Sequence, residues 1–130
     1  MRKFIIPGLL LLLSALLLAA CTSTKSDEPA KAVEAYWQAL VAQDSARLSS
    51  LSCKDYEAEA LNTLESFKSV STTLNDLACT TDSKSDSSAA VKCSGTIVAS
   101  YGTENLTINL ADRSYSAVKE GGAWLMCGAQ

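Results

Sequence analysis

The chain has 130 residues, with 11 Lys and Arg against 14 Asp and Glu, and it contains no histidine. This length suits one small domain and is too short for two. The negative net charge comes without any basic stripe, which argues against nucleic-acid binding by phosphate neutralisation. The lack of histidine excludes every mechanism that uses a histidine base, including that of the usual serine hydrolases.

The beginning of the chain has the layout of an export signal. Two basic residues are followed by a leucine-rich apolar run and then by two alanines that stand directly before Cys21. That order is typical of a secretory signal peptide. The run from residue 4 to residue 20 has 17 positions, whereas a stable membrane span needs about 20 apolar residues. We therefore expect residues 1–20 to be a signal peptide.

The four residues Leu18-Ala19-Ala20-Cys21 resemble the bacterial lipobox. The resemblance implies cleavage before Cys21 and a lipid on its thiol, which anchors the protein to the extracytoplasmic side of a membrane in the bacterial cell envelope. Two or three acyl chains hold a protein on a bilayer, whereas a single chain is marginal. The alternatives are an ordinary signal peptide or an uncleaved anchor. Residues 21–28 then form a short lipidated tether, and residues 29–130 form the domain.

Without residues 1–20, 9 basic residues remain against 14 acidic ones, because Arg2 and Lys3 are lost from the total of 11. The mature net charge is therefore −5 (9 − 14). A membrane, reached through the lipid on Cys21, is an expected partner, whereas nucleic acid is not.

Three helices are predicted in the first half of the domain. Glu28-Pro29 favours a helix start, because proline suits the first helical position and an acid suits the positive end of the helix dipole. Apolar residues then recur at helical spacing, at Val33, Tyr36, Trp37, Leu40 and Val41. Asp44 is expected to cap a second, shorter helix, and Asp55 a third. The apolar faces of these two contain Leu48 and Leu51, and Ala60, Leu61, Leu64 and Phe67.

The second half of the domain is predicted to be a sheet. Residues 69–81 fit neither the helical nor the strand periodicity cleanly, and only their end is predicted to be a strand. A polar loop is predicted over residues 80–88. Residues 91–101 form a long predicted strand, in which Gly95 indicates a bulge or a sharp bend.

Strict alternation over residues 106–110 is the clearest strand signal in the chain. Tyr115 and Ala117 have the opposite parity, so a bulge near Asp112-Arg113 would keep one face buried; the alternative for these two charges is a solvated ion pair. Gly121-Gly122 predicts a hairpin turn before a last strand over residues 123–127. Three helices followed by about four antiparallel strands predict an α+β domain.

Four cysteines lie in the domain, at positions 53, 79, 93 and 127. An even number in a small exported domain favours disulfides. A structural metal site is the rival, but no pair has a C-x-x-C spacing, and we expect neither a metal nor a cofactor. Four cysteines permit three pairings.

The register of the hairpin around the polar loop favours one of these pairings. If its strands pair about Asp86, Cys79 and Cys93 stand opposite each other, since 86 − 79 equals 93 − 86. Opposed positions in a non-hydrogen-bonded pair lie about 4.5 Å apart at Cα, which is close enough for a disulfide. We therefore expect Cys79–Cys93 and Cys53–Cys127.

Two short motifs then suggest a family. The stretch YWQAL at residues 36–40, followed by Asp44, resembles the opening common in small lipoproteins and SnoaL-like proteins. Residues 115–128, with a Lys-Glu-Gly-Gly turn before a tryptophan, are similar to their closing hairpin. With the order of elements, this resemblance to the nuclear transport factor 2-like, or cystatin-like, superfamily covers about residues 29–128. It implies a strongly curved antiparallel sheet packed against three helices, with a conical pocket that serves catalysis in some relatives and only binding in others.

Candidate pocket residues are few. Tyr36, Tyr101 and Trp124 are predicted to line the cone, because aromatic rings shape apolar sites while their polar tips orient ligands. Core packing is the alternative for each. Asp112 and Tyr115 would be the acid–base pair of an enzyme, but simple alternation places them on opposite faces, and nothing in the sequence predicts the dry surroundings that a catalytic carboxylate needs.

The sequence therefore predicts a non-enzymatic, lipid-anchored envelope protein whose domain binds a small ligand or a partner protein. One alternative is a cone-pocket enzyme that uses Asp and Tyr. The other is a structural module that forms homodimers through the outer face of the sheet. An open cone with a buried carboxylate facing a tyrosine would favour the enzyme, whereas a cone filled by its own side chains would favour a partner-binding or structural role.

Overall fold

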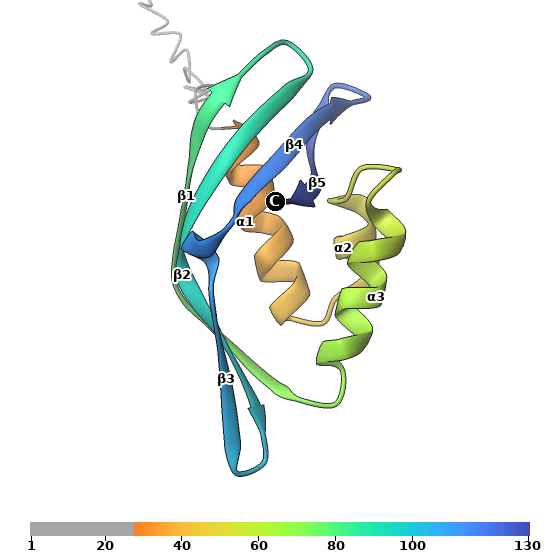
Figure 1. Ribbon diagram of the computed structural model, residues 1–130. Helices are drawn as coiled ribbons and strands as arrows, with labels where there is room; N and C mark the ends of the chain where they lie inside the picture. Colours follow the sequence, from red (N-terminus) through yellow and green to blue (C-terminus); the bar gives the residue numbers. More distant parts are fainter. Residues whose placement is uncertain (1–27) are drawn as a thin grey trace, which may run out of the picture.

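The structure is a computed structural model that describes residues 28–130. The expected signal peptide, Cys21 and the expected tether up to residue 27 lie outside the described residues. Three helices come first, α1 (Glu28–Val41), α2 (Ser45–Ser50) and α3 (Glu57–Phe67), and a strongly curved antiparallel sheet follows. Figure 1 shows the three helices on the concave side of that sheet. The predicted α+β class is confirmed.

The helices follow their sequence signals with one exception. α1 begins at Glu28, the last residue of the expected tether, and its buried face contains Pro29, Ala30, Val33, Tyr36, Ala39 and Leu40. Asp44 caps α2 as predicted, because its carboxylate accepts a hydrogen bond from the backbone N–H of Arg47 at 3.0 Å. None of the helices within residues 28–130 has the length and apolarity needed to cross a membrane.

The exception is the cap of α3. Asp55 was predicted to cap this helix, but Tyr56 is the residue that precedes it, and no side chain caps it. The carbonyl oxygen of Cys53 instead accepts hydrogen bonds from the backbone N–H groups of Tyr56 and Glu57, at 3.0 and 2.9 Å. A backbone turn therefore takes the place of the side-chain cap.

The sheet has five strands, in the order β1-β2-β4-β5, with β3 also paired to β2. β1 (Ser71–Lys84) and β2 (Ser88–Tyr101) form a long hairpin. β3 (Glu104–Asn109) and β4 (Ser114–Glu120) pair with different halves of β2, and β5 (Ala123–Ala129) forms the last hairpin with β4. The bulge expected near Asp112 is a short 3₁₀ turn, η2 (Leu110–Asp112). This turn divides one predicted strand path into β3 and β4.

β1 is longer than its sequence suggested. Its pairing with β2 runs from Ser71 to Lys84, so the predicted polar loop over residues 80–88 shrinks to residues 85–87. Most residues of β1 are exposed or half-buried. A strand that is not packed on both faces needs no apolar run. Its polar side chains give no hydrophobic pattern by which the strand could be predicted.

The irregularity at Gly95 is present, but the extra residues lie in the partner strand. Between Asn75 and Ala78 the register shifts, so that Asp76 and Leu77 stand opposite Gly95. Gly95 has a φ of 109°, and a Cβ there would lie 2.6 Å from the carbonyl oxygen of Asn75. Only glycine fits this close approach of two strands.

Both disulfides have the predicted pairing. Cys79 and Cys93 stand directly opposite each other in the β1–β2 hairpin, with Cα atoms 4.0 Å apart. Cys53 and Cys127, 74 residues apart in the sequence, join the connection between α2 and α3 to β5. Next to this bond, the backbone N–H of Cys53 donates to the carbonyl oxygen of Met126 at 2.8 Å.

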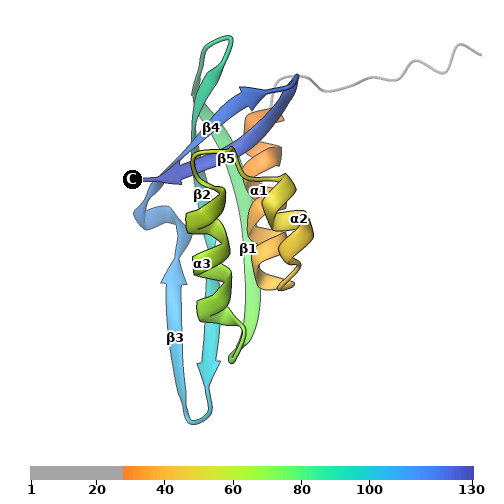
Figure 2. The ribbon, with the colours of Figure 1, turned by 90° about the vertical axis from the view of Figure 1, so that its right-hand side faces the viewer.

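One end of the sheet extends beyond the helices. Figure 2 shows the hairpin of β2 and β3 projecting past the end of α3. We call residues 99–106 the β2–β3 arm. Tyr101 and Leu106 in this arm are each 51% exposed. The three helices and the sheet share one buried core, and we therefore expect residues 28–130 to fold as one unit.

A candidate ligand-binding cavity

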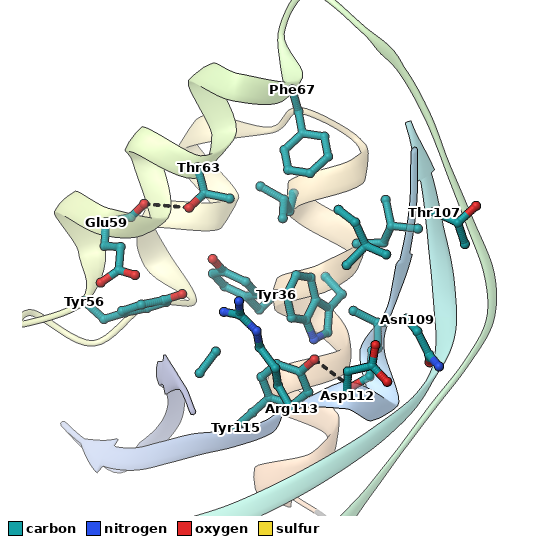
Figure 3. Close-up of a pocket in the computed structure, with 16 residues that line it drawn as sticks. Tyr36, Tyr56, Glu59, Thr63, Phe67, Thr107, Asn109, Asp112, Arg113 and Tyr115 are labelled. Carbon is teal, nitrogen blue, oxygen red and sulfur yellow. Dashed lines mark hydrogen bonds between the residues drawn. The ribbon is translucent and has the colours of Figure 1, made fainter. Parts of the chain in front are cut away.

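A cavity of about 570 Å³ lies between α1, α3 and the concave face of the sheet (Figure 3). This volume is within the range of small-molecule sites, about 300–1,000 Å³. The side chains and backbone that line it are Tyr36, Trp37, Leu40, Tyr56, Glu59, Thr63, Phe67, Ile97, Thr107, Ile108, Asn109, Leu110, Asp112, Arg113, Tyr115 and Ala129. The predicted cone is therefore open rather than filled.

The walls are aromatic and aliphatic. α1 contributes Tyr36 and Trp37, whose rings meet edge to face with centroids 5.2 Å apart. Trp37 also packs at 75° against the ring of Tyr115, with centroids 5.3 Å apart. The sheet contributes Ile97, which is 1% exposed, and α3 contributes Phe67. This interlocked packing fixes the aromatic rings and makes the wall rigid.

Alternation in β3 decides which of its atoms reach the cavity. Ile108 pairs with Ile97 and shares its concave face. Thr107 and Asn109 have the other parity, and Figure 3 shows their side chains turned away from the cavity. These two residues therefore line it with their main chain.

Three tyrosine hydroxyls lie around the cavity. Burial raises the pKa of Tyr36, and the adjacent Tyr56 adds to the shift. Burial also raises the pKa of Tyr56 and that of Tyr115, although the charge of Arg113 opposes both shifts. At neutral pH all three phenols are therefore neutral hydrogen-bonding groups.

The hydroxyl of Tyr115 is already engaged. It donates a buried hydrogen bond of 2.7 Å to the carbonyl oxygen of Leu110, drawn in Figure 3. This bond ties the start of β4 to η2. By contrast, the indole N–H of Trp37 is buried and has no hydrogen-bond partner within residues 28–130.

Charged groups lie at the mouth. Glu59, Asp112 and Arg113 all line the cavity and all are exposed. The ion pair between Asp112 and Arg113, which was the alternative to a bulge, is absent from the described residues. η2 ends at Asp112, and Arg113 has extended backbone, with φ −132° and ψ 159°. The two neighbouring side chains therefore leave the chain in different directions, as Figure 3 shows.

Of the three predicted pocket residues, the structure places Tyr36 in the wall. Tyr101 does not line this cavity and is half-exposed on the β2–β3 arm. Trp124 does not line it either; it is buried near the β4–β5 turn and lines a separate groove. The ammonium groups of Lys84 and Lys119 lie 5.8 and 5.9 Å from the centre of the Trp124 ring.

Three important residues of the cavity were not predicted from the sequence. Trp37 was assigned to the core stripe of its helix, and its position next to Tyr36 was the available signal. Tyr56 precedes α3 and belongs to no periodic pattern. Arg113 points inward because η2 resets the alternation; the parity of Tyr115 and Ala117 indicated this bulge, but Arg113 was not assigned to the pocket.

Within residues 28–130, no group of three or more Cys, Asp and Glu side chains is arranged to hold a metal ion. The polar side-chain groups that line the cavity include hydroxyls, two carboxylates and one guanidinium. They suit hydrogen bonding to an organic ligand better than coordination of a metal.

No protein-family model matches this chain, and no curated protein sequence matches it either. Among solved structures, the fold is similar to the solution structure of a SEC-C motif containing protein from Rhodopseudomonas palustris, with a TM-score of 0.52. The match covers 76% of this chain and 74% of that chain, at 9% sequence identity. This likeness shows a shared fold alone.

Proposed function

We propose that this protein is a lipid-anchored protein of the bacterial cell envelope that binds a small, largely apolar ligand in the cavity between its helices and its sheet. The open cavity of about 570 Å³ carries this proposal. Its aromatic walls would bury the body of the ligand, while its few polar groups would orient it. The element order and the curved sheet also support the resemblance to the nuclear transport factor 2-like superfamily, which we propose as the family.

Binding without catalysis suits the polar groups of the cavity. Its two carboxylates, Glu59 and Asp112, are exposed, whereas a general acid or base at neutral pH is usually poised by burial. The hydroxyl of Tyr115, which would be the second member of an Asp–Tyr pair, donates to the carbonyl of Leu110. These observations favour a binding protein over a cone-pocket enzyme.

The anchor is proposed from the lipobox-like residues that end at Cys21. Glu28, where α1 begins, follows Cys21 by seven residues, which span at most about 25 Å when fully extended. A lipid on Cys21 would therefore hold the start of α1 close to the membrane. In Figure 1 the β1–β2 and β4–β5 turns lie toward that same end of the molecule, and the β2–β3 arm points away from it. Labelling cells with a radioactive fatty acid tests the anchor, and a Cys21→Ser variant should carry no label.

The binding proposal is tested with the neutral fluorescent probe N-phenyl-1-naphthylamine, which brightens in apolar sites. Residues 22–130, exported to an oxidising compartment, contain the range that we expect to fold as one unit. We expect saturable binding of one probe per protein. Thr63→Phe places a ring in the cavity, since Thr63 lines it from α3, and should weaken binding by about tenfold, or about 1.4 kcal/mol.

Thr80→Phe is the matched control, because Thr80 is exposed on β1 and does not line the cavity. It should leave the affinity unchanged. Equal affinity in both variants, or no saturable binding by the unaltered domain, would refute the cavity as a ligand site.

A further inference from the structure

We propose that Arg113 binds an acidic group of the ligand, so that the cavity selects an amphipathic monoanion: an apolar aromatic or aliphatic body with one carboxylate or sulfonate. This inference rests on the proposed function. It places the charged end of the ligand next to Arg113.

The direction of the Arg113 side chain is set by the backbone. Arg113 and Tyr115 are two residues apart in extended chain, so their side chains leave the same face. Tyr115 is buried in the concave face, and Arg113 is therefore directed to that face too. Figure 3 shows its guanidinium group at the mouth of the cavity, on the side of Tyr36 and Tyr56.

Within residues 28–130 the guanidinium group has no partner of opposite charge, because Arg113 forms no ion pair with any of them. Of the described side chains that line the cavity, Arg113 is the only cation. Burial raises the pKa values of Tyr56 and Tyr115, and the charge of Arg113 lowers them in part. Those phenols are neutral at pH 7 and do not balance the charge.

A free guanidinium group at the edge of an apolar cavity favours a planar anion. It presents five N–H donors in a fixed plane and binds a carboxylate through two parallel hydrogen bonds. The wall formed by Trp37, Phe67 and Ile97 offers no charge to the rest of the ligand. A ligand that binds both the guanidinium group and the apolar wall has one acidic end and an apolar body.

The carboxylates at the mouth limit the charge of that ligand. Glu59 and Asp112 also line the cavity, so with Arg113 the formal charge around it is −1 (one positive and two negative groups). A second negative charge on the ligand would be repelled by these groups. A monoanion therefore suits the cavity better than a nucleotide or another polyanion.

Two fluorescent probes of nearly the same shape test the inference. 8-Anilinonaphthalene-1-sulfonate is N-phenyl-1-naphthylamine with one added sulfonate. Residues 22–130 should bind the sulfonate probe more tightly than the neutral one. Arg113→Gln should weaken binding of the sulfonate probe by about tenfold, as expected for loss of a charged hydrogen-bonding partner, and should change the affinity for the neutral probe by much less.

Arg47→Gln is the matched control, because Arg47 is exposed on α2 and does not line the cavity; it should change neither affinity. Arg113→Lys keeps the charge without the planar fork and should give an intermediate affinity. Equal thermal midpoints for Arg113→Gln and the unaltered domain would show that the fold is intact.

The outcomes separate the two proposals. If the neutral probe binds in the cavity and Arg113→Gln leaves the affinity for the sulfonate probe unchanged, the role of Arg113 is refuted while the proposed function stands. If neither probe binds saturably, both proposals are refuted. Loss of both affinities in a folded Arg113→Gln domain would also refute a role specific to the anion.

Discussion

The two halves of β2 show how one strand serves as core and as surface. In its first half, Ala89, Val91 and Cys93 are buried between β1, β4 and the helices. At its far end the same alternation continues into the β2–β3 arm, where Tyr101 is half-exposed because no helix covers it. The same side-chain pattern thus yields a packed core or an open face, according to what lies above it.

The cavity lies between the covered half of β2 and its uncovered end. Ile97 belongs to the buried core and also lines the cavity, and Leu106, one pair further along the same face from Ile108, is 51% exposed. The buried core thus ends before the sheet does. The site is therefore a consequence of how far the helices extend over the curved sheet.

The largest expected losses of stability come from the disulfides, both of which lie outside the arm, in the covered part of the molecule. Replacing Cys53 and Cys127 by alanine opens a loop with a sequence separation of 74 and should lower the free energy of unfolding by about 4 kcal/mol. Replacing Cys79 and Cys93 opens a separation of only 14 and should cost about 3 kcal/mol. Urea unfolding of each double variant measures the two losses.

The order of these losses is the informative result, because the chain-entropy argument ties it to loop length. A larger loss from the Cys79–Cys93 pair would contradict that argument. It would mean that the register of the β1–β2 hairpin, rather than the loop closed by Cys53–Cys127, dominates the stability of the buried half.

Losses no larger than these are expected from two truncations on the same face of the sheet. Ile97→Ala removes a side chain that is 1% exposed and should cost about 3 kcal/mol through lost burial and a new void. Leu106→Ala removes one that is 51% exposed and should cost less than about 1 kcal/mol. Denaturant midpoints give both values. Equal losses would show that the arm is packed against something in solution, such as a second copy of the chain.

The smallest effect should appear in alkali. The pKa of Tyr36 in the folded protein is raised above its ordinary value of about 10 by burial, so the folded state holds the phenolic proton more tightly than the unfolded chain. Its contribution to stability is therefore complete below pH 10 and is lost as the pH rises above that value.

Urea midpoints at about pH 7 and about pH 10.5 measure this loss, and Tyr36→Phe should reduce it. The reduction should be partial, because the pKa values of Tyr56 and Tyr115 are raised as well. Tyr101→Phe is the control, since Tyr101 is exposed on the arm. An unchanged pH dependence in Tyr36→Phe would contradict the assignment of its hydroxyl to a buried site.

Much of the fold was predictable because its signals are local. The apolar stripe of α1 and the cap at Asp44 depend on residues close together in the chain. The Cys79–Cys93 pairing depends on the symmetry of one hairpin. β1 was underestimated because exposed strands need no alternation, and the cap of α3 was missed because the carbonyl of Cys53 replaced the side chain of Asp55.

The site was less predictable, for a physical reason. Tyr36, Tyr101 and Trp124 were equivalent as aromatic residues, but only Tyr36 lies where the helices leave space above the sheet. Tyr101 is beyond the helices and Trp124 is near the β4–β5 turn. The distance between two layers is set by the packing of residues far apart in sequence, which no local pattern reports.

The sequence alone determined the α+β class, the three helices, the hairpin turns and a consistent pairing of four cysteines, because short-range periodicity and register fix these features. Tertiary structure decided that β2 has a covered and an uncovered end, that a cavity remains between them, and that Arg113 faces it. Each of these depends on how the curved sheet meets the helices. A single 3₁₀ turn at Leu110–Asp112 changes the alternation and thereby gives the cavity its one cationic side chain in the described chain.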